Sequence, residues 1–103
     1  MNYGLPEPTL RAIRRVLASE PAIHRAILYG SRAKGTHRPG SDIDLAIDGP
    51  SLTHDRLLRL ATALDNLDLP YAIDLSLLHE IENPELLDHI RRVGITFYPT
   101  PAH

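Results

Sequence analysis

The sequence predicts a small α/β domain: a mixed β-sheet of three to four strands with helices packed on it. Two observations support this prediction. The 103 residues suffice for about one domain. Along them the apolar pattern switches repeatedly between the period of a helix and that of a strand. We therefore expect a single domain over residues 1–103, with its core between about residues 8 and 98.

The first half of the chain predicts one helix and two strands. A helix begins near Pro8, because apolar residues recur at helical spacing until Pro21 ends the pattern. A continuous apolar run over residues 26–29, closed by Gly30, predicts a buried strand. Residues 42–48 alternate between apolar and polar, which predicts a second strand with one buried face.

The next segments repeat this alternation of types. Thr53 has the side chain of a helix N-cap, and the apolar residues of the following helix, 54–67, keep the 3.6-residue period. Leu58 lies off that apolar stripe and is a candidate for a partner surface. Residues 71–77 alternate again and predict a third strand.

The last segments have clear boundaries. Asn83 is an N-cap candidate, Pro84 suits the first helical position, and Gly94 follows a basic pair at the expected helix end. Residues 95–98 are short and apolar, so they supply the optional fourth strand.

The amino-acid composition excludes several classes of function. The chain is 43% hydrophobic and 23% charged, with a formal net charge of −2 at pH 7. No direct nucleic-acid binding is expected without an excess of Lys and Arg. The chain has no cysteine, which excludes disulfides, thiolate zinc sites and thiol catalysis. With no apolar run of membrane-spanning length and no signal-like start, we expect a cytoplasmic protein without membrane contact.

The first expected strand is followed directly by the turn Gly30-Ser31-Arg32-Ala33-Lys34-Gly35. Gly30 permits an unusual backbone angle and a close approach of a ligand. A short helix after it would direct unpaired N–H groups outward, and Ser31 adds a hydroxyl donor. Arg32 and Lys34 add positive charge. The sequence therefore predicts a phosphate-binding turn formed by these four residues.

Three carboxylates complete the candidate site. Asp42 and Asp44 are two residues apart on a strand, so their side chains point to the same face. Two adjacent anions are costly unless a cation neutralises them, and oxygen ligands favour Mg²⁺ or Mn²⁺. Asp74 lies on the polar face of the third strand. If the two strands are neighbours, three acids converge and could hold two metal ions for phosphoryl or nucleotidyl transfer.

Other residues are expected to be structural. Tyr29 is more typical of a core than of a base-stacking platform, whereas Asp48 and His79 are expected at the surface. The histidines show no pair at helical metal spacing, so zinc is not expected. These are His24, His37, His54, His79, His89 and His103.

The combination of Gly30-Ser31, ten intervening residues, Asp42-x-Asp44 and a later strand acid at Asp74 resembles the polymerase-β-like nucleotidyltransferase superfamily. More narrowly, it is similar to the minimal nucleotidyltransferases (MNT) over roughly residues 8–98. This resemblance implies that the Gly-Ser turn binds the phosphates of ATP. It also implies that Asp42, Asp44 and Asp74 are the catalytic and metal-binding acids, with two Mg²⁺ ions.

The resemblance further implies a partner. MNT proteins pair with helical HEPN-domain toxins, and they act as antitoxins by transferring AMP from ATP to a toxin tyrosine. Two alternatives stay open. One is transfer to a small-molecule hydroxyl with a helical companion subunit. The other is a non-catalytic antitoxin that binds nucleotide or covers its partner sterically.

Overall fold

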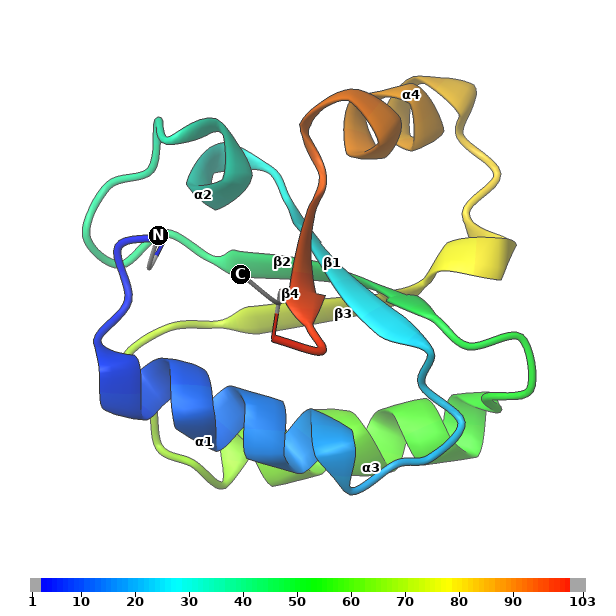
Figure 1. The fold of residues 1–103 in the computed structure, drawn as a ribbon, viewed down its shortest axis with the longest axis horizontal. Helices are drawn as coiled ribbons and strands as arrows, with labels where there is room; N and C mark the ends of the chain where they lie inside the picture. The colour runs from blue at the N-terminus through cyan, green and yellow to red at the C-terminus, as the bar shows by residue number, and fades with distance from the viewer. Residues whose placement is uncertain (1–2, 101–103) are drawn as a thin grey trace.

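A four-stranded β-sheet lies at the centre of the computed structural model, which describes residues 3–100 (Figure 1). The elements follow in the order α1 (Glu7–Ala18), β1 (Arg25–Tyr29), α2 (Ser31–Lys34), β2 (Ile43–Asp48), α3 (His54–Asp65), β3 (Ile73–Leu77), the 3-10 turn η1 (Leu78–Glu80), α4 (Pro84–Val93) and β4 (Ile95–Tyr98).

The sheet is mixed, as the sequence predicts, and it has four strands. The strand order is β3-β2-β1-β4. β1 pairs antiparallel with both β2 and β4, whereas β2 and β3 are parallel. A parallel pair requires a crossover connection, which α3 provides. β2 therefore occupies an inner position between β1 and β3.

Helices cover both faces of the sheet (Figure 1). α1 and α3 lie on one face and enclose the larger core, which takes Ile43, Leu45 and Ile47 from β2. α2 and α4 lie on the other face, where a smaller cluster consists of Ile27, Tyr29, Ala46 and Ile90. The alternation along β2 therefore places Asp44, like Ala46, on the face covered by α2 and α4.

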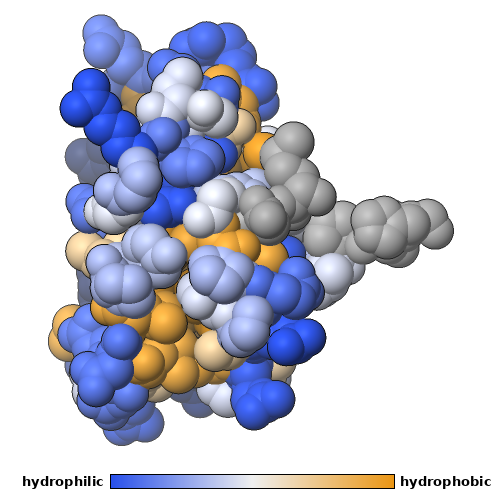
Figure 2. Space-filling view, turned by 90° about the vertical axis from the view of Figure 1, so that its left-hand side faces the viewer, coloured by the Kyte–Doolittle hydropathy of each residue, from blue (hydrophilic) through white to orange (hydrophobic). Residues whose placement is uncertain are grey.

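Figure 2 shows how this division reaches the surface. On the side that it draws, hydrophobic residues gather mainly at the height of α1 and α3, whereas the part at the height of α2 and α4 is mostly hydrophilic. On this side of the molecule, the surface at the height of α2 and α4 is therefore the more polar part.

The helix starts agree with the sequence predictions. The Oγ1 of Thr53 accepts a hydrogen bond from the backbone N–H of Arg56 at 3.3 Å. The Oδ1 of Asn83 accepts one from the N–H of Glu85 at 2.9 Å. The third helix ends at Asp65, two residues before the expected end. Between residues 3 and 100 no helix has the length and apolar character that a membrane span requires.

The end of α4 differs from the expected glycine cap. Gly94 has φ −61° and ψ 138°, a conformation open to any residue, so it is not a left-handed cap. Glycine is needed here because there is no room for a side chain. A Cβ at this position would overlap the carbonyl oxygen of Ile90 and lie 2.7 Å from Cγ2 of Ile27. Gly94 therefore lets the end of α4 pack closely on β1.

Candidate functional site

The turn after β1 is shaped by Gly30, which caps the N-terminus of α2. Its φ of 78° and ψ of −156° are accessible to glycine but strained for other residues. A Cβ on Gly30 would also overlap Oδ2 of Asp44. The second glycine, Gly35, closes α2 in a left-handed conformation. Gly30 thus brings the backbone of the turn directly against the acid of β2.

Three side chains form a row across three strands. Tyr29 of β1 is the register partner of Asp44 of β2, and Asp44 is in turn the register partner of Asp74 of β3. Residues directly opposite one another project to the same face of a sheet. Asp42, two residues before Asp44, extends the acids along β2. The structure therefore makes the two acid-bearing strands neighbours and brings Asp44 and Asp74 together.

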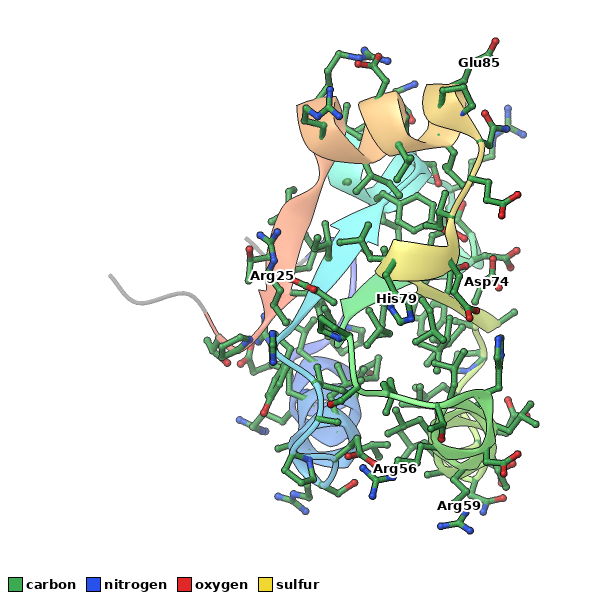
Figure 3. The ribbon with its side chains drawn as sticks, turned by 90° about the vertical axis from the view of Figure 1, so that its right-hand side faces the viewer. Arg25, Arg56, Arg59, Asp74, His79 and Glu85 are labelled. Atoms are coloured by element: carbon green, nitrogen blue, oxygen red, sulfur yellow. The ribbon has the colours of Figure 1, made fainter. Side chains whose placement is uncertain are left out.

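The acids differ in exposure. Asp42 and Asp74 are exposed, whereas Asp44 is partly buried. Figure 3 shows Asp74 at one edge of the molecule, on the opposite side from Arg25. Burial raises the pKa of Asp44 above its ordinary value of 3.8. The negative charges of Asp74 and then Asp42 raise this pKa further, whereas a positive charge on His89, present only when both of its ring nitrogens are protonated, would lower it. The ionised acids thus repel one another.

This donor set fits a hard divalent cation. All the ligands are carboxylate oxygens, and the repulsion at Asp44 is what a cation would relieve. In the described part of the chain, no three carboxylate or imidazole groups are grouped so that they could hold a metal ion. Because Asp42 and Asp74 are exposed, their side chains can change rotamer toward Asp44. A metal would therefore bind with side-chain adjustment on a fixed backbone.

Arg32 does not fit the predicted contact with phosphate, and this part of the prediction is corrected. Its side chain is buried, with an exposed fraction of 2%. Nη1 donates to the carbonyl of Tyr3 at 2.8 Å, and Nε and Nη2 both donate to that of Ser41, at 3.1 and 2.9 Å. The guanidinium also lies 4.9 Å from the centre of the Tyr71 ring. Arg32 therefore ties the chain start and the loop before β2 to α2.

Ser31 and Lys34, the other predicted side chains of the turn, are both accessible to solvent at least in part. Ser31 is partly buried at the start of α2, and Lys34 is exposed at its end. The N–H groups of the first helical turn have no partner within so short a helix. Ser31, the turn backbone and Lys34 thus remain the candidates for phosphate binding.

His89 is a site residue that the sequence analysis missed. Its Nε2 accepts a hydrogen bond of 3.1 Å from the backbone N–H of Gly30. Its ring meets the ring of Tyr29 edge to face, with centroids 6.2 Å apart and an interplanar angle of 81°. The available signal was a polar residue next to Ile90 and three residues after Leu86, within the apolar stripe of α4. Screening histidines only for metal pairs overlooked it.

The structure agrees with the expected places of Tyr29 in the core and of Asp48 and His79 at the surface. Tyr29 is buried, and this burial raises the pKa of its phenol above 10.0, with the charges of Asp44 and Asp74 adding to the shift and a hydrogen bond with Ser76 opposing it. Asp48 forms an ion pair of 3.1 Å with Arg25 at the other end of β2. His79 is exposed on η1.

Two cavities lie outside the row formed by Tyr29, Asp44 and Asp74. One, of about 470 Å³, is an open hollow between α4 and the outer end of β1 and β4, with Arg25 and Thr96 in its lining. The other, of about 330 Å³, lies beside α2 near Tyr3 and His37. Neither is lined by Asp42, Asp44 or Asp74.

Solved structures share the fold of this chain. A toxin–antitoxin with AMP-PNP is 26% identical, with a TM-score of 0.67, over 91% of this chain and 73% of the other. A complex of the tri-AMPylated Shewanella oneidensis HEPN toxin with its MNT antitoxin shares the fold at 22% identity and a TM-score of 0.65, over 89% of this chain and 71% of the other. A mutant of the MntA–HpeT toxin–antitoxin does so at 24% identity and a TM-score of 0.65, over 91% and 73%.

The sequence itself gives the family. No curated protein matches the chain. The family described as polymerase beta, nucleotidyltransferase, matches residues 11–101, which include the Gly-Ser turn and all three acids. The protein therefore belongs to the polymerase beta nucleotidyltransferase family.

Proposed function

We propose that this protein transfers AMP from MgATP to a tyrosine hydroxyl of a HEPN-type toxin and thereby acts as its antitoxin. The observation that carries the proposal is the pairing of Asp44 with Asp74 on neighbouring strands, directly beside the Gly30 turn. Family membership supports the nucleotidyl chemistry. The similarity to a toxin–antitoxin solved with AMP-PNP supports the nucleotide and the class of partner.

The turn after β1 would bind the triphosphate. Ser31 would donate through its hydroxyl and backbone N–H, and Lys34, at the exposed end of α2, would pair with a phosphate oxygen. Arg32 has no part in this step because its guanidinium is committed to carbonyls of the protein. Placing the β- and γ-phosphates here would direct the α-phosphate toward the carboxylates of β2 and β3.

Asp42 and Asp44 would hold the magnesium ions, with Asp74 as a further ligand. Magnesium, when bound, would neutralise charge on the triphosphate and lower the pKa of the attacking hydroxyl. The partial burial of Asp44 strengthens its interaction with any cation, because less water screens it. Exposed Asp74 is placed to accept a proton at a carboxylate oxygen.

The proposed step is an in-line displacement at the α-phosphorus of ATP. The tyrosine oxygen forms a bond to this phosphorus, and its proton passes to the carboxylate of Asp74. The bond to the oxygen that bridges the α- and β-phosphates breaks, and its electron pair leaves with pyrophosphate. The products are AMP-tyrosine, pyrophosphate and a proton, so the charges and atoms balance.

The open position of the acids suits an acceptor presented by another protein. Asp42 and Asp74 are exposed, and Asp74 lies on the edge strand β3. A tyrosine on the surface of a second chain can therefore approach them from solvent. We place this reaction in the cytoplasm, where ATP and a HEPN-type toxin would both be found.

The test is intact-mass spectrometry of the product of a neighbouring open reading frame, chosen because its sequence is that of a helical HEPN-domain protein. The two proteins are incubated with ATP and Mg²⁺, and a gain of one or more AMP units on a partner tyrosine is expected. The Asp42→Asn/Asp44→Asn double variant should give no gain. Asp48→Asn is the matched control, because it removes a carboxylate from the same strand outside the row of acids.

Two results would contradict the proposal. A stable complex whose partner never gains mass would indicate a steric or nucleotide-binding antitoxin. Absence of any complex, together with ATP turnover on an added small-molecule alcohol, would assign the acceptor to the small-molecule class.

A further inference from the structure

We propose that His89 is a positioning residue of the ATP site: its imidazole holds the Gly30 turn in place through the backbone, without touching the nucleotide. This inference rests on the proposed function for its kinetic consequence. Its structural part concerns only the free protein. It assigns to α4, which carries none of the sequence motif, a direct role in the geometry of that motif.

The hydrogen bond between Gly30 and His89 is the first observation. The backbone N–H of Gly30 donates to Nε2 of His89 at 3.1 Å, across 59 positions of sequence. The carbonyl of the same residue accepts from the N–H of Lys34 at 3.1 Å. Both polar backbone groups of Gly30 are therefore occupied, one by α2 and one by α4. This fixes the peptide planes on both sides of Gly30.

Acceptance by Nε2 defines the state of the imidazole. A neutral imidazole has one N–H and one acceptor nitrogen. Because Nε2 accepts here, the proton must lie on Nδ1. A ring with its proton on Nε2 would place two donors against each other and would push the turn away from α4. The structure thus requires one specific tautomer of His89.

The ring of His89 is itself held in place. It meets Tyr29 edge to face, and Tyr29 is buried against the sheet. The adjacent residue, Ile90, is buried in the smaller cluster with Tyr29. Close packing at Gly94 sets the distance between the end of α4 and β1. The imidazole is therefore presented from a regular helix packed against the sheet, as a positioning group must be.

The hydrogen bond from Gly30 distinguishes His89 from a phosphate-binding residue, because its Nε2 contacts the protein backbone. It acts on Gly30, whose missing Cβ is what lets the turn lie against Asp44. Loss of the bond would let the turn move relative to the acid, which would misplace the bound phosphates. The consequence is weaker nucleotide binding caused by a residue with no nucleotide contact.

The test compares two variants. His89→Phe keeps a ring against Tyr29 and removes the acceptor, whereas His89→Gln offers an amide oxygen that can accept from Gly30. For His89→Phe we expect AMP-PNP with Mg²⁺ to bind about 5- to 30-fold more weakly, the range for a lost hydrogen bond of this kind. We expect the change in the transfer reaction to lie mainly in KM for ATP. His89→Gln should recover most of the affinity.

A measurement on the unmodified protein keeps the inference independent of transfer activity. Long-range ¹H–¹⁵N NMR should show His89 protonated at Nδ1, and the Gly30 amide proton should move upfield in His89→Phe. If transfer is absent but these results hold, only the proposed function fails. A proton on Nε2, unchanged AMP-PNP affinity in His89→Phe, or equal losses in the Phe and Gln variants would overturn the role of His89.

Discussion

Asp44 and Asp74 are direct register partners on the parallel strands β2 and β3, and both project to the face covered by α2 and α4. Their carboxylates are brought together by backbone pairing, so the fold itself imposes the repulsion. The larger core on the opposite face offsets the cost of this repulsion, because every second residue of β2 (Ile43, Leu45 and Ile47) is buried there. Charge at these two positions therefore affects stability and function in opposite directions.

Asp44→Asn should abolish transfer and stabilise the fold at neutral pH. The pKa of Asp44 is raised in the folded state, so its ionised form is less favourable there than in the unfolded chain. The wild type therefore loses stability as the pH rises through the raised pKa, and the variant does not. Urea denaturation should show a gain at neutral pH that disappears below pH 3.8, where Asp44 is protonated in both states.

For the same variant, AMP transfer should fall by at least about 100-fold, since a charged group at the reaction centre is removed. Asp48→Asn, which loses only a surface pair with Arg25, should retain transfer. Destabilisation of Asp44→Asn at neutral pH would contradict the account of repelling acids.

Gly30→Ala should impair transfer far more than Gly35→Ala. Both glycines have φ of 78°, so each substitution carries backbone strain of about 1–3 kcal/mol. A Cβ at Gly30 would overlap Asp44, whereas a Cβ at Gly35 would have no neighbour within 4 Å. Thermal unfolding should show a loss in both variants, and only Gly30→Ala should also lose ATP binding. Equal effects on binding would mean that strain alone is responsible.

Arg32→Met should lower the free energy of unfolding by about 2–4 kcal/mol, because the carbonyls of Tyr3 and Ser41 lose a charged hydrogen-bond donor. Lys34→Met, at an exposed position, should change stability by less than about 0.5 kcal/mol. In nucleotide-binding assays we expect Lys34→Met to show the larger specific loss once each variant is measured in its folded state. A stable Arg32→Met variant with weak ATP binding would restore Arg32 to the phosphate site.

Gly94→Ala should destabilise the domain by about 1–3 kcal/mol through crowding. Its φ of −61° suits alanine, so backbone strain plays no part. The added methyl group would meet the Ile90 carbonyl and Ile27. Chemical denaturation measures the effect, with Gly40→Ala as the converse case, because a Cβ there meets nothing within 4 Å but the φ of 85° strains alanine. A gain in stability for Gly94→Ala would show that α4 can shift away from β1.

Local patterns predict much of this fold. The caps at Thr53 and Asn83 depend on hydrogen bonds within three residues of the cap, so the sequence order alone reveals them. The alternation along β2 likewise indicates which side chains share a face with Asp44. The same reasoning indicates that Asp42 and Asp44 belong together, because their spacing is set by a single strand.

Relationships between distant segments could not be predicted in this way. The pairing of Asp44 with Asp74 requires that β3 be parallel and adjacent to β2, which depends on how α3 crosses over. Arg32 was misassigned because its carbonyl partners, Tyr3 and Ser41, lie in loops without periodicity. His89 was missed because its partner is a backbone N–H 59 positions away.

The unequal cores on the two faces of the sheet have a consequence for local opening. α4 is held mainly by a small cluster around Ile90, whereas α1 is anchored in the larger core through Leu10, Ile13 and Leu17. Less buried apolar surface means a lower free energy of detachment, so α4 amides should exchange with solvent before those of α1. Each such detachment of α4 would release Gly30 from His89 while the core on the other face of the sheet stays folded.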